Sequence, residues 1–122
     1  DILLAEKHYK KGSLYLHQQK WEEAKKEFII ALEFADDYIL ALNDLGYVLL
    51  KMENYTEALT VLEKAKKINP EDFEILYNIG FTYFKQNNFN EAKQYLEKVL
   101  SISLDKSSLT YKRAKDLLEK IK

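Results

Sequence analysis

The chain has 122 residues, of which 47% are hydrophobic and 32% charged, and its formal net charge is −1. This length suits a single domain, and the apolar content excludes an intrinsically disordered chain. The balanced charge argues against a dedicated nucleic-acid binder, and the absence of cysteine excludes disulfides, thiolate metal sites and a cysteine nucleophile. No apolar run approaches the ~20 residues that a membrane span needs.

Residues that favour helices dominate the sequence, which has only three glycines and one proline. Apolar residues recur at helical spacing, as at Leu42, Leu45 and Leu49, and turn-like segments separate the periodic stretches. The pattern predicts helices over residues 2–18, 22–35, 38–52, 56–68, 71–86, 90–103 and 107–121. We therefore expect an all-α fold.

Three short segments between these helices match one another. They begin at Gln19, Glu53 and Asn87, and each ends on an aromatic residue. Asparagine tolerates the left-handed backbone conformation that ends many helices. The segments are therefore predicted to be tight turns.

Other connections carry residues that can start a helix. Asn69 is predicted to cap the next helix with Pro70 at its first helical position, and Asp36 to cap at the preceding boundary. Ser107 and Ser108 offer the same kind of cap near the end of the chain.

The whole pattern repeats every 34 residues. The three glycines, Gly12, Gly46 and Gly80, are spaced at this interval. Aromatic, small and large apolar residues recur at the same interval, namely Trp21, Tyr55 and Phe89; Ala24, Ala58 and Ala92; Phe28, Leu62 and Leu96; and Ala31, Ala65 and Val99. A fixed period of this length in a helical chain predicts an array of stacked helical repeats.

At these positions the chain resembles the tetratricopeptide repeat family, in which each 34-residue unit is a pair of antiparallel helices. The resemblance covers about residues 5–106, although the family's proline between units occurs only at Pro70. It implies a right-handed α-solenoid of three antiparallel helix-pair repeats with a C-terminal solvating helix. The implied organisation is a single domain, 1–122, with repeats at about 5–38, 39–72 and 73–106 and a capping helix at 107–121.

The recurring small residues have a packing explanation. A glycine within a helix costs about 0.5–1 kcal/mol relative to alanine, which is acceptable where a bulky side chain of the partner helix needs the space. We expect Ala24, Ala58 and Ala92 to form the other side of these close contacts. In the capping helix, Ala114 follows Gly80 by 34 residues, so this helix is predicted to pack like the first helix of a fourth repeat.

Stacked repeats form a concave surface that the first helix of each unit lines. Helical phase then predicts the peptide-binding residues as Tyr9, Ser13, His17, Asn43, Asp44, Tyr47, Lys51, Glu74, Tyr77, Asn78, Phe81 and Lys85, with Glu6, Lys10, Leu16, Leu40, Leu50 and Phe84 beside them. The aromatic residues are predicted to anchor a peptide, and the amides to orient its backbone. The alternative is that the rings pack on neighbouring helices and expose only their hydroxyl groups.

The charges of this surface are also ordered. Glu74 lies at a helix start, whereas His17, Lys51 and Lys85 lie near helix ends. A bipolar groove that selects the direction of a bound peptide is one interpretation, and complementarity to the helix dipoles is the other.

One function of the family can be tested by residue. Members that hold the acidic tails of heat-shock chaperones use a clamp of Lys, Asn, Asn, Lys and Arg. The matching residues here are Tyr9, Ser13, Asp44, Glu74 and Asn78, so no cation of the clamp is present. We therefore expect this chain not to bind such tails.

No arrangement of residues supports catalysis. His8 and His17 are too far apart in sequence to share the i, i+4 face of a zinc pair, and the isolated glycines form no phosphate-binding loop. We expect no enzyme activity, no cofactor and no metal.

The expected function is a protein–protein interaction module or scaffold with a protein or peptide partner and with neither nucleic acid nor a membrane span. The alternatives are self-association through the terminal helices, which would give a homo-oligomer, and, less favoured, RNA binding. Because the chain begins at Asp1, it is expected to be trimmed or excerpted; its compartment stays open, with the cytoplasm as the default.

Overall fold

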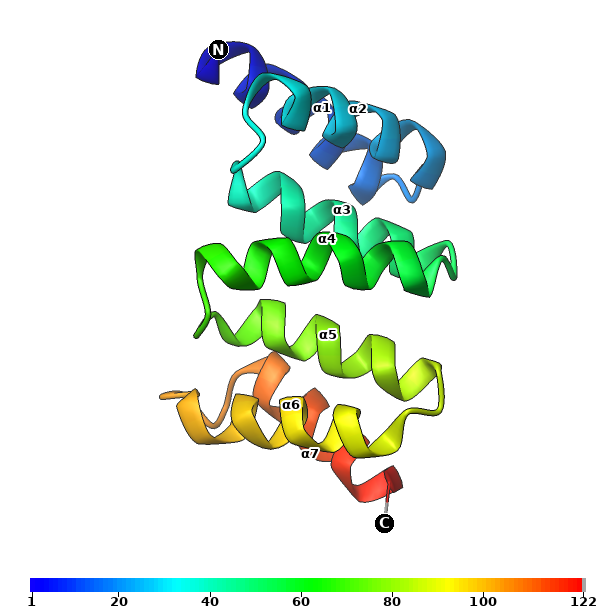
Figure 1. The fold of residues 1–122 in the computed structure, drawn as a ribbon, viewed down its shortest axis with the longest axis vertical. Helices are drawn as coiled ribbons and strands as arrows, with labels where there is room; N and C mark the ends of the chain where they lie inside the picture. The colour runs from blue at the N-terminus through cyan, green and yellow to red at the C-terminus, as the bar shows by residue number, and fades with distance from the viewer. Residues whose placement is uncertain (122) are drawn as a thin grey trace. The chain divides into compact units, whose positions relative to one another are not determined.

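The computed structural model describes residues 1–121, and these residues contain no strand. Their helices are α1 (Ile2–His17), α2 (Trp21–Phe34), α3 (Ile39–Lys51), α4 (Tyr55–Ile68), α5 (Phe73–Lys85), α6 (Phe89–Ile102) and α7 (Leu109–Ile121) (Figure 1). The all-α prediction is confirmed. The starts of α5 and α7 differ most from the prediction, since they lie at residues 73 and 109 where 71 and 107 were expected.

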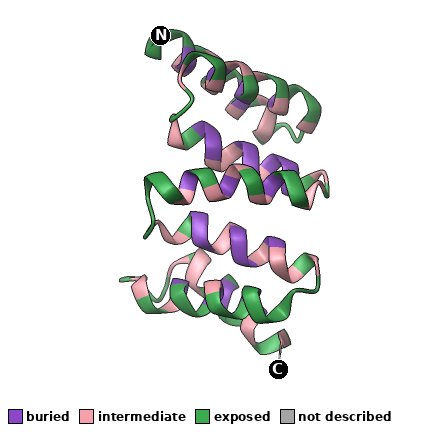
Figure 2. Ribbon diagram, viewed as in Figure 1, coloured by how far each residue is buried: buried purple, intermediate pink, exposed green. Residues whose placement is uncertain are grey.

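The chain divides into two compact units, Asp1–Ile68 and Asn69–Lys122. In the first unit α1 pairs with α2, α3 pairs with α4, and α2 also packs on α3. In the second unit α5 pairs with α6, and α7 packs mainly on α6. Buried residues are concentrated on α3 and α5 (Figure 2). The grouping of all three repeats into a single domain stays a prediction.

The predicted tight turns are confirmed. Gln19, Glu53 and Asn87 adopt left-handed conformations, with φ of 58°, 62° and 64°. In the first turn the Lys20 N–H returns to the Tyr15 carbonyl at 2.9 Å, and the other turns repeat this bond. The bond is typical of a helix end that satisfies its last carbonyls through one left-handed residue. Only Asn87 among the three residues is asparagine. Gln19 and Glu53 adopt the same left-handed conformation because the hydrogen bond across each turn stabilises it.

The predicted start of α5 was wrong. Asp72 is the N-cap, and its Oδ1 accepts hydrogen bonds from the N–H groups of Glu74 and Ile75 at 2.9 and 3.2 Å. Pro70 lies in the turn before the helix. A carboxylate that accepts two N–H donors at a positive helix end stabilises this start better than Asn69 could.

Of the other predicted caps, one was wrong and one is confirmed. Asp36 lies in the turn before α3, whose N-cap is Tyr38 without a side-chain bond, so the prediction for Asp36 was wrong. Ser108 does cap α7, because its Oγ accepts the N–H of Tyr111 at 3.1 Å.

The predicted close contact of each glycine with a bulky side chain of the partner helix is confirmed. A Cβ added to Gly46 would lie 2.5 Å from Leu62, and one added to Gly12 would lie 2.6 Å from the ring of Phe28. At Gly80 the nearest side chain, Leu96, would be 3.1 Å away. The predicted alanines are fully buried, but the atoms that need the space belong mainly to the large residue four positions later in the same helix.

Helix α7 packs as predicted for the first helix of a fourth repeat. It contacts α6 and α5, as α3 contacts α2 and α1, and its Ala114 and Leu117 are buried in a core cluster with residues of α6. Arg113 and Asp116 are exposed on its polar side, although the matching residues of α5, Ile79 and Thr82, are fully buried. A polar outer side is what a helix that closes a stack of repeats requires.

Candidate functional site

In the first unit the predicted site residues lie on α1 and α3. We call this surface the α1–α3 face, and it consists of Tyr9, Ser13, His17, Asn43, Asp44, Tyr47 and Lys51. His17 and Lys51 are exposed, and the other members are partly exposed. Leu50, which was expected beside them, is buried, because the helix turns it into the core.

A hydrogen bond joins the two helices at this face. The Tyr9 hydroxyl donates to Asp44 Oδ2 at 2.7 Å. The Tyr9 ring stacks on Tyr38 with centroids 5.4 Å apart and tilts against Phe28 at 5.7 Å. Burial, together with the bond to Asp44, raises the pKa of Tyr9 well above its ordinary value. For Tyr9 the structure therefore matches the alternative in which the ring packs on neighbouring helices.

Asp44 is a partly buried carboxylate in a largely aromatic setting. Burial raises its pKa above the ordinary value, against the opposing effects of the Tyr9 hydroxyl and of nearby His17. The Nδ1 atom of His17 lies 2.7 Å from the Ser13 carbonyl oxygen of its own helix. Asp44 is the acidic member of the α1–α3 face.

Tyr47 lies one turn further along α3 from Asp44. Trp21 meets its ring edge-on, with centroids 6.4 Å apart and an interplanar angle of 72°. The Lys51 Nζ lies 5.7 Å from the centroid of the Tyr47 ring, within cation–π range. The contacts hold this ring in place while leaving it partly exposed.

In the second unit the predicted residues lie on α5. We call this surface the α5 face, and it consists of Glu74, Tyr77, Asn78, Phe81 and Lys85. Tyr77 stacks on Phe81 with centroids 6.1 Å apart and nearly parallel rings. Burial raises the pKa of Tyr77; nearby Arg113 opposes this effect and Asp116 adds to it.

The two faces share a repeated contact. The Lys85 Nζ lies 5.8 Å from the centroid of Phe81, as Lys51 does over Tyr47. Both pairs are spaced i, i+4 on a helix, where side chains are neighbours. Sequence analysis treated these lysines only as charges at helix ends; the aromatic–lysine spacing was the signal that could have revealed the pairing.

Tyr38 is the residue of this face that sequence analysis missed. It lies in the connection before α3 and stacks on Tyr9. Sequence analysis placed Tyr38 at the first position of the helix predicted over residues 38–52 and did not assign it to the surface; an aromatic residue at a helix start was the signal that could have pointed to it.

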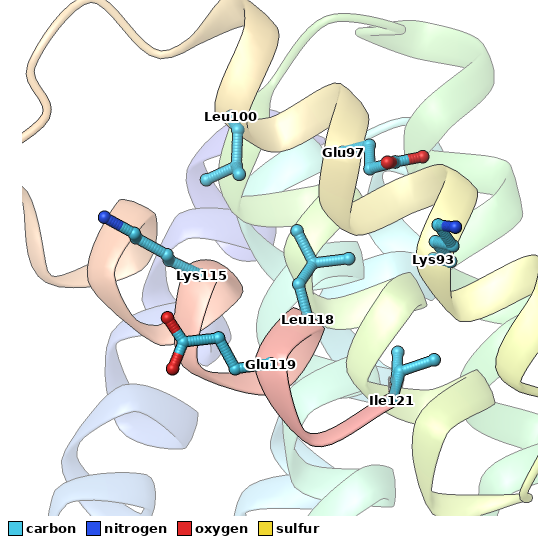
Figure 3. Close-up of a pocket in the computed structure, with 7 residues that line it drawn as sticks. All are labelled: Lys93, Glu97, Leu100, Lys115, Leu118, Glu119 and Ile121. Carbon is cyan, nitrogen blue, oxygen red and sulfur yellow. The ribbon is translucent and has the colours of Figure 1, made fainter.

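A separate pocket lies between α6 and α7. Its volume is about 400 Å³, and its lining comprises Lys93, Glu97, Leu100, Lys115, Leu118, Glu119 and Ile121. Leu100, Leu118 and Ile121 point into the space between the two helices, with charged residues around them (Figure 3). None of these residues belongs to the predicted site.

Within residues 1–121 no group of three or more His, Asp and Glu side chains could hold a metal ion. In the same range, none of the helices has the length and apolar character required to cross a bilayer. His8 Nδ1 lies 2.8 Å from Glu27 Oε1, and its ring stacks on Phe34, so this histidine joins α1 to α2.

A family model described as tetratricopeptide repeat matches residues 3–71 and 37–105. The chain belongs to the tetratricopeptide repeat family. The observed helix pairs and turns agree with this assignment. No curated protein matches the chain in sequence.

Solved structures of the family are similar to this chain in fold. The first TPR of Spaghetti (RPAP3) bound to the HSP90 peptide SRMEEVD is 20% identical, with a TM-score of 0.89 over 99% of this chain and 92% of that one. The TPR domain of Arabidopsis OM64 is 18% identical, with a TM-score of 0.87 over 98% and 97%. The TPR2B domain of yeast Sti1 in complex with pHsp70 is 16% identical, with a TM-score of 0.89 over 98% and 96%.

Proposed function

We propose that this chain is a non-catalytic protein-interaction module in which the α1–α3 face and the α5 face are each a binding surface for a peptide or a partner helix. The observation that carries the proposal is the pair of partly exposed aromatic residues held under lysines. Tyr47 and Phe81 occupy matching positions in successive repeats, and each ring has a lysine amine within 6 Å of its centroid.

Such rings suit peptide binding for two reasons. An aromatic side chain buries a large area on contact, and it loses little rotamer freedom because it has only two side-chain torsions. The contacts of Tyr47 with Trp21 and of Phe81 with Tyr77 order these rings before any ligand arrives. Preorganisation of this kind reduces the entropic cost of binding.

The polar members of the faces supply orientation. Asn43 and Asn78 each carry an amide that can both donate to and accept from an extended peptide backbone. Both side chains are partly buried beside the aromatic rings. Support also comes from fold relatives, since the structures of the Spaghetti and Sti1 domains are described as complexes with an HSP90 peptide and with pHsp70.

The test is a pull-down that identifies a partner, followed by titration of that partner with a double variant. Tyr47→Ala with Phe81→Ala is expected to weaken binding by more than ~2 kcal/mol, because alanine removes the anchor area of both faces. Circular dichroism is expected to show unchanged helicity.

The matched control is Leu104→Ala, which removes a fully exposed apolar side chain outside both faces. Unchanged affinity in the double variant would contradict the proposal, and so would an equal loss in the Leu104 variant.

A further inference from the structure

We propose that Asp44 makes the α1–α3 face selective for a basic peptide, one that presents an arginine or lysine side chain beside an apolar residue. This inference rests on the proposed function and names the class of its ligand. It also predicts that the face discriminates against acidic peptides.

The first argument concerns the charge of Asp44. The carboxylate has lost part of its hydration, and the donor that fixes it is the neutral hydroxyl of Tyr9, 2.7 Å away. A neutral donor leaves the negative charge of a carboxylate in place, whereas a cationic ligand would neutralise it. A desolvated carboxylate therefore gains more from an incoming cation than a fully hydrated one does.

The second argument concerns the other charges near this face. The Lys10 Nζ pairs with Glu6 Oε1 at 2.9 Å, and Lys51 lies over the Tyr47 ring. His17 lies near Asp44 on the α1 side, with its Nδ1 atom at the Ser13 carbonyl. Lys10 is thus paired with a carboxylate, whereas Lys51 keeps its positive charge over a neutral ring. Asp44 has a neutral hydroxyl as its hydrogen-bond donor.

The third argument concerns the surroundings of the carboxylate. The rings of Tyr9 and Tyr38 stack on one another next to Asp44, and guanidinium groups pack favourably on aromatic faces. One turn earlier on α3, Leu40 exposes 54% of its surface and offers an apolar contact for the residue next to the cation. Carboxylate, aromatic ring and leucine together match a basic side chain with an apolar neighbour.

The contrast with a structurally similar domain sharpens the inference. The HSP90 peptide bound by the Spaghetti domain, SRMEEVD, carries three acidic side chains and one arginine. A central carboxylate repels such a peptide at short range, and the penalty grows as the local dielectric constant falls. The α1–α3 face is thus expected to prefer a positively charged peptide.

The test uses two fluorescently labelled peptides and measures their affinities by polarisation at low salt. One is Ser-Gln-Met-Glu-Glu-Val-Asp, which carries no cationic side chain, and the other is Ser-Arg-Met-Lys-Lys-Val-Lys with a C-terminal amide. The wild-type chain is expected to bind the basic peptide at least tenfold more tightly. Added salt is expected to reduce this preference, because the interaction is partly solvent-exposed.

The decisive variant is Asp44→Asn. Asparagine keeps an oxygen that accepts the Tyr9 hydroxyl but removes the charge, so the fold is expected to survive while the preference falls to less than threefold. The control, Glu33→Gln, removes one negative charge from the exposed surface of α2 and is expected to keep the preference. A thermal melt of each variant verifies folding.

The outcomes separate this inference from the proposed function. If the acidic peptide binds as tightly as the basic one and Tyr47→Ala weakens both, the face binds peptides and the charge selection is wrong. If the basic peptide binds but neither Asp44→Asn nor Tyr47→Ala affects it, both proposals are wrong for this face. Failure of the basic peptide to bind wild type overturns the charge selection, and the partner titration with the double variant then decides the proposed function.

Discussion

Tyr9 and Asp44 show why the role of a single residue depends on contacts that sequence pattern does not contain. Helical phase placed both on the side away from the buried glycine, and both are partly exposed. It could not show that the Tyr9 ring would stack on Tyr38, a residue of the next connection, or that its hydroxyl would reach Asp44. These contacts are tertiary. Tyr9, which was predicted to anchor a peptide, instead donates a hydrogen bond to the Asp44 carboxylate.

The raised pKa of Asp44 predicts a pH-dependent stability difference. Because burial favours the protonated carboxyl in the folded state, ionisation of Asp44 destabilises the fold as the pH rises above the ordinary value of 3.8. Asp44→Asn, which cannot ionise, is therefore expected to be more stable than wild type at pH 7. The gain is expected to shrink as the pH falls toward 3.8.

Urea denaturation of both proteins across this pH range measures the effect. The Glu33→Gln variant again controls for net charge. If Asp44→Asn is less stable than wild type at pH 7, the charged Asp44 carboxylate stabilises the fold, contrary to this account.

At the scale of helices, the 34-residue period was a strong predictor because it combines glycine spacing, apolar phase and turn position in one signal. Local chemistry was harder to predict. Sequence analysis assigned the cap of α5 to Asn69, whereas the structure shows that the carboxylate of Asp72 accepts two N–H donors. The packing of α7 was predictable because Ala114 continues the 34-residue spacing of the glycines, and it is fully buried.

The glycine contacts predict a graded response to alanine. At Gly46 the added methyl group would overlap the fully buried Leu62 at 2.5 Å. Gly46→Ala is expected to lose ~1–3 kcal/mol of unfolding free energy, because overpacking outweighs the better helix propensity of alanine. Chemical denaturation followed by circular dichroism measures the loss.

Gly80→Ala is the matched comparison. Its added methyl group would lie 3.1 Å from Leu96, so small shifts can accommodate it, and the gain in helix propensity is expected to offset most of the cost. Equal losses at the two positions would contradict the packing explanation for the repeated glycines.

At the scale of the whole molecule, family membership and helix-pair architecture followed from the sequence, whereas the partner did not. The residues that recur every 34 positions pack helices together, whereas function resides in the side chains of a site that the fold carries. Self-association through the terminal helices stays a prediction. The candidate faces consequently depend on side-chain detail, such as the lysines over Tyr47 and Phe81, rather than on the fold.

The most direct test of the central claim is amide chemical-shift mapping by NMR as the lysine-substituted heptapeptide is added to the labelled chain. The account predicts shift changes on α1 and α3 around Asp44 and Tyr47, with none beside Leu100 or Leu118. Changes confined to the pocket between α6 and α7, with the α1–α3 and α5 faces unaffected, would contradict it.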